Sequence, residues 1–241
     1  MSGHSKWNNI KQKKGKQDAI KGKLFTKIGR ELSVAVKEGG PNPDHNSKLR
    51  YVIAKAKANN MPNTNIENAI KKASGEGGEN TFYEIMYEGY GKGGVAILVK
   101  ALTDNKNRTA SEVRHVFSKH NGNLGEPGSV SYMFEQKGVI VIEKEGLRYD
   151  EDTLMMEMIE SGAEDFKSYD EVYEIKTDIK DFDSVHKKVE ELGIKPIEAS
   201  IQMVPKISVP STDELSESIE KIVEALDDLD DVQDVYTNLD D

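Results

Sequence analysis

Lysine and arginine side chains offer the clearest chemistry in this sequence, because they gather at one end of an acidic chain. Residues 1–75 carry 16 Lys and Arg against 5 Asp and Glu, a net charge of +11, and the other 166 residues carry 17 against 38, a net charge of −21. The formal net charge of −10 hides this asymmetry. A basic segment on an acidic chain is typical of proteins that bind a polyanion. We therefore expect contacts between cations and phosphates at the N-terminal end.

The sequence offers no comparable pattern for catalysis or for metal binding. It contains no Cys, which excludes disulfides, thiolate metal sites and cysteine nucleophiles. His115 and His120 stand five apart, not at the i, i+4 spacing of a helical metal pair, and carboxylate pairs such as Glu143 and Glu145 arise in any acidic sequence. The stretch "GYGKGGV" lacks the spacing of a phosphate loop and favours a hairpin turn. We expect no enzyme, no cofactor and no metal.

Residues 2–17 form a basic arm without a periodic apolar pattern. Such a segment cannot supply a core of its own, but its cations can neutralise the phosphates of a nucleic acid. The tryptophan of the arm can stack on a base, although packing against the following helices is the favoured interpretation. The arm residues expected at a nucleic acid are Lys6, Trp7, Lys11, Lys13, Lys14 and Lys16.

Three amphipathic helices are predicted after the arm, and they have to position the remaining cations. Apolar residues recur at helical spacing in residues 18–38, 49–56 and 66–73, so each helix buries one stripe and leaves its cations outside. A charged but unliganded surface explains the same pattern and stays as the alternative. The cations assigned to nucleic acid here are Lys21, Lys23, Lys27, Arg30, Lys48, Arg50, Lys55, Lys57, Lys71 and Lys72.

The starts of the second and third helices carry recognisable signals. Asn42 can cap the second helix with Pro43 at its first helical position. Thr64 and Glu67 have the spacing of a capping box for the third helix.

The stretch "DNKNRTASEVR", residues 104–114, places two more cations near a predicted helix start. Asn107 or Thr109 can cap this helix. Lys106 and Arg108 would then join free backbone N–H groups around a phosphate. An ordinary helix cap without a ligand is the alternative.

The remainder of the chain alternates strand and helix signals. Two β-rich segments in residues 82–103 predict a hairpin, which is followed by a helix and by the strand "SVSYMF" at 129–134. From Gly138 the order is strand, helix, two strands, helix and strand, which is the ferredoxin-like pattern. A last helix at 213–229 and a strand at 232–239 are expected to return and complete the unit that begins with the hairpin.

These elements predict three domains and an α+β fold class. A basic helical domain with its arm occupies residues 1–76. Residues 77–135 together with 208–241 form an α+β domain, and residues 136–207 form a ferredoxin-like domain that is inserted into it. The expected fold is thus a three-helix domain followed by two ferredoxin-like domains, the third inserted into the second.

Four blocks of the sequence closely resemble the YebC/PmpR family, and the resemblance extends over the whole chain. They read "SGHSKWNNIKQKKGKQDAIKGKLFTKIGREL", "PNTNIENAIKKASGE", "YEGYGKGGVAILVKALTDNKNRTASEVR" and "GSVSYMF". The resemblance implies the inserted architecture and a DNA-binding transcriptional regulator. It also implies roles in translation, because a mitochondrial relative is a translational activator of cytochrome oxidase subunit I and some bacterial relatives resemble ribosome-associated factors.

The arm departs from the family's pattern at two places. Lys14, Gly15 and Lys16 stand where many relatives have Arg and Ala, and Ile20 and Lys21 stand where they have a basic pair. Lysine keeps the charge but cannot make the bidentate phosphate contacts of arginine. This difference weakens the case for base-specific recognition by the arm.

We expect a cytoplasmic, nucleic-acid-binding regulator of gene expression, and specifically a DNA-binding transcriptional regulator that grips the phosphate backbone through its basic N-terminal domain. A ribosome-associated translation factor or translational activator that binds ribosomal or messenger RNA is the alternative. A protein-interaction scaffold, in which the lysines only aid solubility, is a third possibility. The sequence contains no apolar run that could cross a membrane, and no small-molecule substrate is expected.

The chain ends in the acidic stretch "DDLDDVQDVYTNLDD", residues 227–241. We expect these acids to face solvent and to repel nucleic acid from the acidic part of the chain. A sharper hypothesis is that they compete with nucleic acid for the lysine arm, and deletion of residues 227–241 would test it.

Overall fold

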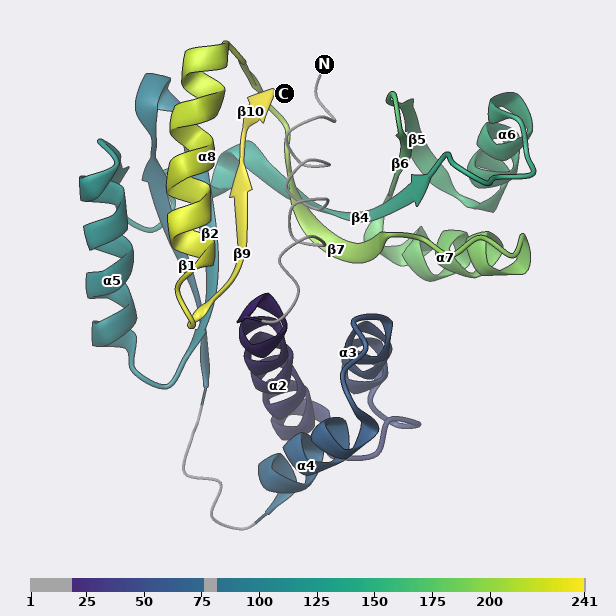
Figure 1. Cartoon of the computed structure of the whole chain (residues 1–241), viewed down its shortest axis with the longest axis horizontal. Coiled ribbons are helices and arrows are strands. Elements are labelled where there is room, and N and C mark those ends of the chain that lie inside the picture. The colour runs from purple at the N-terminus through teal and green to yellow at the C-terminus, as the bar shows by residue number, and fades with distance from the viewer. Residues whose placement is uncertain (1–18, 76–81, 241) are drawn as a thin grey trace. The chain divides into compact units, whose positions relative to one another are not determined.

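The computed structural model describes residues 19–75 and 82–240, with side chains from residue 22 onward (Figure 1). These residues form two compact units. Of the described residues, one unit contains 19–75, 82–130 and 213–237, and the other contains 131–212 and 238–240. The chain therefore leaves the first unit and later returns to it.

Three helices open the first unit and share one apolar core. They are α2 (Ala19–Gly39), α3 (Ser47–Ala58) and α4 (Asn63–Ser74). Ile28 and Leu32 of α2 and Leu49 of α3 are fully buried, and Ile66 of α4 is nearly so. The helices thus bury the apolar stripes that their periodicity predicts.

The cap of α3 differs from the prediction. Asn46, not Asn42, caps this helix, because its side-chain oxygen accepts the N–H of Leu49 at 2.9 Å. The amide of Asn46 also donates to the carbonyl oxygens of Ala35 and Gly40, at 2.7 and 2.8 Å. These bonds tie the cap to the end of α2, so tertiary contacts decide where α3 begins.

The predicted capping box of α4 is also wrong. This helix begins at Asn63, directly after Pro62, and no side chain caps it. Thr64 lies inside the first turn, whereas a capping residue has to stand before it with non-helical backbone angles. Pro62 occupies the position before the helix, and its ring fixes φ at −58° there.

The first unit also contains a four-stranded antiparallel sheet in the order β3-β1-β2-β9. Its strands are β1 (Tyr83–Tyr90), β2 (Ala96–Thr103), β3 (Asn123–Leu124) and β9 (Val232–Thr237). Helix α5 (Lys106–Lys119) packs against α8 (Asp213–Asp227), and α8 packs against β9 (Figure 1). The predicted hairpin is confirmed, and Gly93 and Gly94 turn it with φ of 70° and 77°, a region that favours glycine.

The second unit has the predicted ferredoxin-like order. Its main elements are β4 (Phe134–Glu143), α6 (Glu151–Ser161), β5 (Ala163–Ser168), β6 (Val172–Thr177), α7 (Phe182–Glu191) and β7 (Glu198–Pro205). The sheet order β5-β6-β4-β7 makes the first and third strands of this unit central. Two short strands, β8 (Val209–Pro210) and β10 (Leu239–Asp240), pair in parallel as a separate sheet.

The sheet of the first unit has the same spatial arrangement with a different chain order. Strands β2 and β3 flank β1 and are joined through α5, and β9 lies on the other side of β2. The second unit is inserted between β3 and α8, so the last helix and strand complete the sheet from which the chain departed. The predicted α+β fold class, with the third domain inserted into the second, is confirmed.

The predicted strand at residues 129–134 is wrong. Val130 is fully buried but Tyr132 is 60% exposed, so alternate residues do not share a face as they would in a strand. The carboxylate of Glu88 accepts the N–H groups of Gly128 and Val130, each at 2.8 Å. These two bonds hold residues 128–130 in a loop, and residues 131–133 form a short 3-10 helix. Strand β3 forms the edge of the sheet instead.

Candidate nucleic-acid interface

One face of α2 carries three cations that the sequence assigns to nucleic acid. Lys23, Lys27 and Arg30 recur at i, i+4 and i+7, which brings their side chains to one side of the helix. In the structure they contact Asp227–Asp231, the segment that joins the end of α8 to β9 and that we call the acidic turn. These cations therefore have partners within their own unit.

The two lysines bind both carboxylate and backbone oxygens of the acidic turn. The Nζ of Lys23 lies 3.1 Å from Oδ1 and 3.2 Å from the carbonyl oxygen of Asp228. The Nζ of Lys27 donates to the carbonyl oxygen of Asp227 at 2.9 Å and lies 3.8 Å from its Oδ1. Carbonyl groups at the end of a helix have no intrahelical donor and carry partial negative charge. The lysines of α2 therefore stabilise the C-terminus of α8.

Asp231 is the buried centre of this contact, with a side chain that is 3% exposed. Its Oδ1 lies 2.7 Å from Nη1 of Arg30. Its Oδ2 accepts from Arg108 at 2.7 Å and from the hydroxyls of Thr103 and Thr109 at 2.9 and 2.6 Å. Burial alone would raise the pKa of this carboxyl, but the hydrogen bonds from Thr109 and Arg108 lead the opposing effects, and the pKa is lowered.

Two more of the assigned cations are paired inside the helical domain. The Nζ of Lys55 lies 2.8 Å from Glu31, and that of Lys48 lies 2.7 Å from Glu38. Burial alone would lower the pKa of Lys55, but the charge of Glu31 leads the opposing effects, and the pKa is raised. Lys55 is thus held as a cation by α2.

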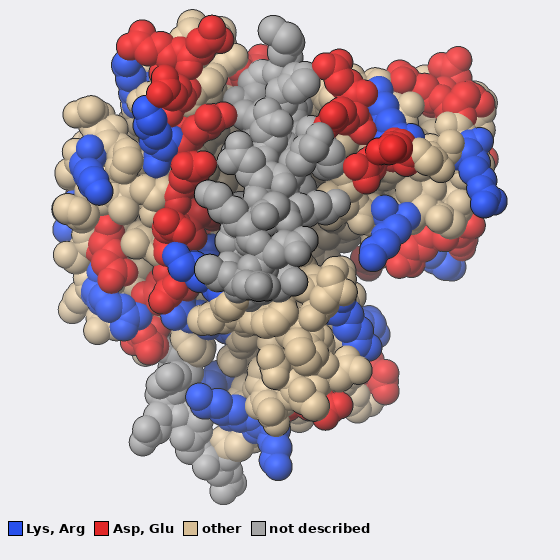
Figure 2. All heavy atoms as spheres, viewed as in Figure 1, with Lys and Arg blue, Asp and Glu red and all other residues tan. Residues whose placement is uncertain are grey.

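Four assigned cations have a different environment, and we call them the α3–α4 cations: Arg50, Lys57, Lys71 and Lys72. All four are exposed, and none forms an ion pair with another residue in the described part of the chain. The first two stand seven apart on α3 and share a face, and the other two lie in the last turn of α4. Figure 2 shows cationic side chains at the surface of both helices.

The helix start at residues 104–114 differs from the prediction. Asn105 caps α5, because its side-chain oxygen accepts the N–H of Arg108 at 3.1 Å. Neither Asn107 nor Thr109 can serve as the cap, since both lie within the helix. The hydroxyl of Thr109 is instead turned to the buried carboxylate in the acidic turn.

The two cations of this stretch also have partners nearby. The Nζ of Lys106 lies 4.1 Å from the centre of the Tyr83 ring. Arg108 lies 2.8 Å from Asp104 and 2.7 Å from Asp231, and the hydrogen bond that it donates to Asp231 leads the effects that raise the pKa of Arg108. Arg108 therefore belongs to the network around the acidic turn.

The remaining assigned residues lie outside the part that the structure describes. They are Lys6, Trp7, Lys11, Lys13, Lys14, Lys16 and the side chain of Lys21.

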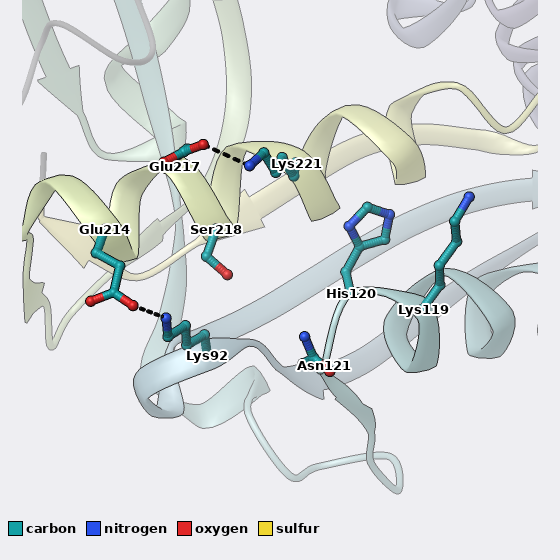
Figure 3. Close-up of a pocket in the computed structure, with 8 residues that line it drawn as sticks. All are labelled: Lys92, Lys119, His120, Asn121, Glu214, Glu217, Ser218 and Lys221. Carbon is teal, nitrogen blue, oxygen red and sulfur yellow. Dashed lines mark hydrogen bonds and ion pairs between the residues drawn. The ribbon is translucent and has the colours of Figure 1, made fainter.

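A surface pocket of about 300 Å³ lies among the end of α5, the β1–β2 turn and α8 (Figure 3). Two ion pairs line it, Lys92 with Glu214 at 2.5 Å and Lys221 with Glu217 at 2.6 Å. His120 also faces it. Because its lining is of mixed charge, the pocket lacks the uniformly positive field that would select phosphate.

Residues 19–75 and 82–240 offer neither a metal site nor a membrane-spanning helix. These ranges contain no cluster of three or more His, Asp or Glu that could hold a metal ion. None of their helices is both long and apolar enough to cross a membrane.

Two consecutive stretches of the chain match one protein family. Residues 5–76 match the TACO1/YebC protein N-terminal domain, and residues 82–239 match the TACO1/YebC second and third domain. The chain belongs to the TACO1/YebC family. The resemblance to YebC/PmpR proteins that the sequence blocks indicate is confirmed.

Relatives in the TACO1/YebC family carry regulatory names. A probable transcriptional regulatory protein of Hathewaya histolytica is 61% identical over 205 residues, which cover 85% of this chain and 83% of that protein. Another, of Thermoanaerobacter pseudethanolicus, is 51% identical over 240 residues, 100% of this chain and 97% of that protein. The crystal structure of a conserved hypothetical protein from Aquifex aeolicus matches with a TM-score of 0.85 at 47% identity, covering 93% and 92% of the two chains.

Sequence reasoning missed the role of the acidic turn in this TACO1/YebC chain. The acids of residues 227–241 were expected to face solvent, which is wrong for Asp231, because this residue is buried. The sequence signal for a buried Asp231 is its place directly before an apolar strand, and this signal does not identify its partner in α2.

Proposed function

We propose that this TACO1/YebC chain is a nucleic-acid-binding regulator of gene expression that grips the backbone of duplex DNA through its helical domain. The contrast among its cations carries the proposal. The α2 cations contact the acidic turn, whereas the α3–α4 cations are exposed and form no ion pair within the described residues. The names of the relatives, which refer to transcription, support the regulatory role.

The proposed mechanism is electrostatic. Lysine and arginine that approach phosphates release condensed counterions, which gives affinity that falls steeply with salt and depends little on sequence. Contacts of this kind position a protein on the backbone. Residues 131–212 carry 10 Lys and Arg against 19 Asp and Glu, so the second unit repels a polyanion and leaves the helical domain as the binding element.

Charge neutralisation tests the proposal. The test variant combines R50Q, K57Q, K71Q and K72Q. The control variant removes four lysines of the second unit: K180Q, K187Q, K195Q and K206Q. Both variants lose four positive charges, so a difference in their DNA binding depends on where the charges lie in the protein. We expect the test variant to reduce the slope of log affinity against log salt for duplex DNA by about 3 to 4, since each phosphate contact contributes about 0.9.

The control should keep the wild-type slope. Equal slopes for the test variant, the control and the wild type would contradict the proposed interface. Circular dichroism of each variant checks that the helices remain folded.

In-cell ultraviolet crosslinking separates DNA from RNA as the target. Enrichment of a few DNA sites on the purified protein would support the transcriptional role. Dominant fragments of ribosomal RNA from one site would overturn the DNA assignment and make the chain a translation factor that uses the same cations.

A further inference from the structure

The cations of α2 contact oxygen atoms of the acidic turn in the way that they could contact the oxygen atoms of a phosphate backbone. Lys23 and Lys27 each meet one carbonyl and one carboxylate oxygen of the turn. Arg30 binds a carboxylate oxygen of Asp231 and the carbonyl oxygen of Asp230. Carboxylate oxygens, together with carbonyl oxygens that carry partial negative charge, thus lie along a row of cations, where the oxygens of a nucleic-acid backbone could also bind.

The contact changes from buried to exposed along α2. The side chains of Arg30 and Asp231 are 16% and 3% exposed, and those of Lys23 and Asp228 are 48% and 80% exposed. Breaking a buried pair is costly because it leaves an uncompensated charge. An exposed pair contributes little to stability and is screened by salt. The middle pair is also largely buried, since the side chains of Lys27 and Asp227 are 14% and 20% exposed. The contact is therefore anchored at Asp231 and is weakest between Lys23 and Asp228.

We propose that the acidic turn is an internal competitor for nucleic acid. In the free protein it occupies Lys23 and Lys27, and a bound phosphate backbone displaces its carboxylates from these two lysines. The inference rests on the proposed function and adds a regulation of the same site: the α3–α4 cations make the first contact, and the turn limits how many more cations join it.

Neutralising the turn should strengthen binding. The test variant combines D227N, D228N and D230N and leaves the buried Asp231 in place. The control combines D213N, E220Q and E224Q on α8, three carboxylates that form no ion pair in the described part of the chain. Both variants remove three negative charges from the same unit. With duplex DNA at about 0.15 M salt, where charges beyond about 8 Å are largely screened, we expect roughly tenfold tighter binding for the test variant and less than about twofold for the control.

A double-mutant cycle gives a sharper test, because general electrostatics predicts additive effects. Replacing both lysines, K23Q with K27Q, removes the competing contact together with the phosphate contacts. We expect this pair to weaken binding by less than about twofold in the wild type, and by about tenfold in the neutralised-turn background, where no competitor occupies the lysines.

Three outcomes decide the inference. Equal affinities for the test and control variants, with additive effects in the cycle, would overturn it. Wild-type protein that binds neither duplex DNA nor structured RNA would overturn the proposed function first, so the two failures are distinguishable. If the triple variant unfolds in urea earlier than the wild type, D228N alone is used, since its side chain is mostly exposed; wild-type affinity in that variant would then count against the competitor.

Discussion

At the residue scale, Asp231 holds the helical domain to the sheet of the same unit. Its carboxylate links Arg30 of α2 to Arg108 of α5 and is almost fully buried. Asparagine has the same size but lacks the charge that the two guanidinium groups require. We expect D231N to lower the free energy of unfolding by about 3 kcal/mol, measured by urea unfolding.

The matched control is D228N in the same turn. Asp228 forms an exposed pair with Lys23, so its replacement should change the free energy of unfolding by less than about 0.5 kcal/mol. If D231N and D228N lowered the free energy of unfolding equally, the burial of Asp231 and its contacts with the two guanidinium groups would not contribute to stability.

The lowered pKa of Asp231 also predicts a pH dependence. The unfolded chain protonates this carboxyl near pH 4, and the folded protein does so only at a lower pH. Its stabilisation is therefore complete above the unfolded pKa and is lost as the pH falls through the folded pKa. We expect the difference in unfolding free energy between wild type and D231N to be constant from pH 8 to about pH 5 and to shrink below about pH 4.

Urea unfolding of both proteins between pH 8 and pH 3 measures this difference. Other carboxyls titrate in both proteins and cancel. A difference that stays constant to pH 3 would contradict the assigned role of the carboxylate.

At the element scale, replacing glycine by alanine is expected to change the free energy of unfolding in opposite directions at two positions. Gly29 lies inside α2, and a Cβ there would meet nothing within 4 Å, so G29A should raise the free energy of unfolding by about 0.5 to 1 kcal/mol. Gly138 lies on β4, where a Cβ would lie 2.3 Å from Oγ1 of Thr177 and 2.4 Å from Phe182. G138A should lower it by about 1 to 3 kcal/mol.

Thermal and urea unfolding of the two variants give the comparison. Both variants replace glycine by alanine. If the free energy of unfolding changed in the same direction in both, helix propensity and strand packing would not be the deciding factors at these positions.

The element boundaries show why sequence signals mislead at this scale. Asn42 and Asn46 both offer a capping side chain, and a pattern of residue types cannot choose between them. The choice falls to Asn46 because its amide also reaches carbonyl oxygens of α2 and of the loop that follows it. Helix interiors, in contrast, are predicted well, since the apolar period alone determines which face is buried.

At the scale of the whole molecule, the C-terminal segment completes the sheet of the first unit. Strand β9 pairs with β2 over most of its length, and Val232 is fully buried. A chain that ends at Asp231 should therefore lose cooperative thermal unfolding, while a chain that ends at Leu239 should keep it. Circular dichroism on heating measures both, and a cooperative transition in the shorter chain would contradict the role of β9.

Because β9 lies within residues 227–241, deleting this segment does not test its acidic residues alone. Deletion of residues 227–241 would remove β9 together with the acids, so a loss of binding would report unfolding. Substitutions in the acidic turn separate the charge from the fold.

The sequence by itself determined the helices, the ferredoxin-like order of the second unit, the return of the last helix and strand, and the family. These depend on local periodicity and on element order, which are written along the chain. Which cations are available to a ligand was decided only by the tertiary structure. Lys23, Lys57 and Arg108 are similar in sequence terms, yet only Lys57 has no carboxylate partner among the described residues. The physical reason is that ion pairing acts through space: a carboxylate about 200 residues away along the chain neutralises Arg30 once β9 returns beside β2.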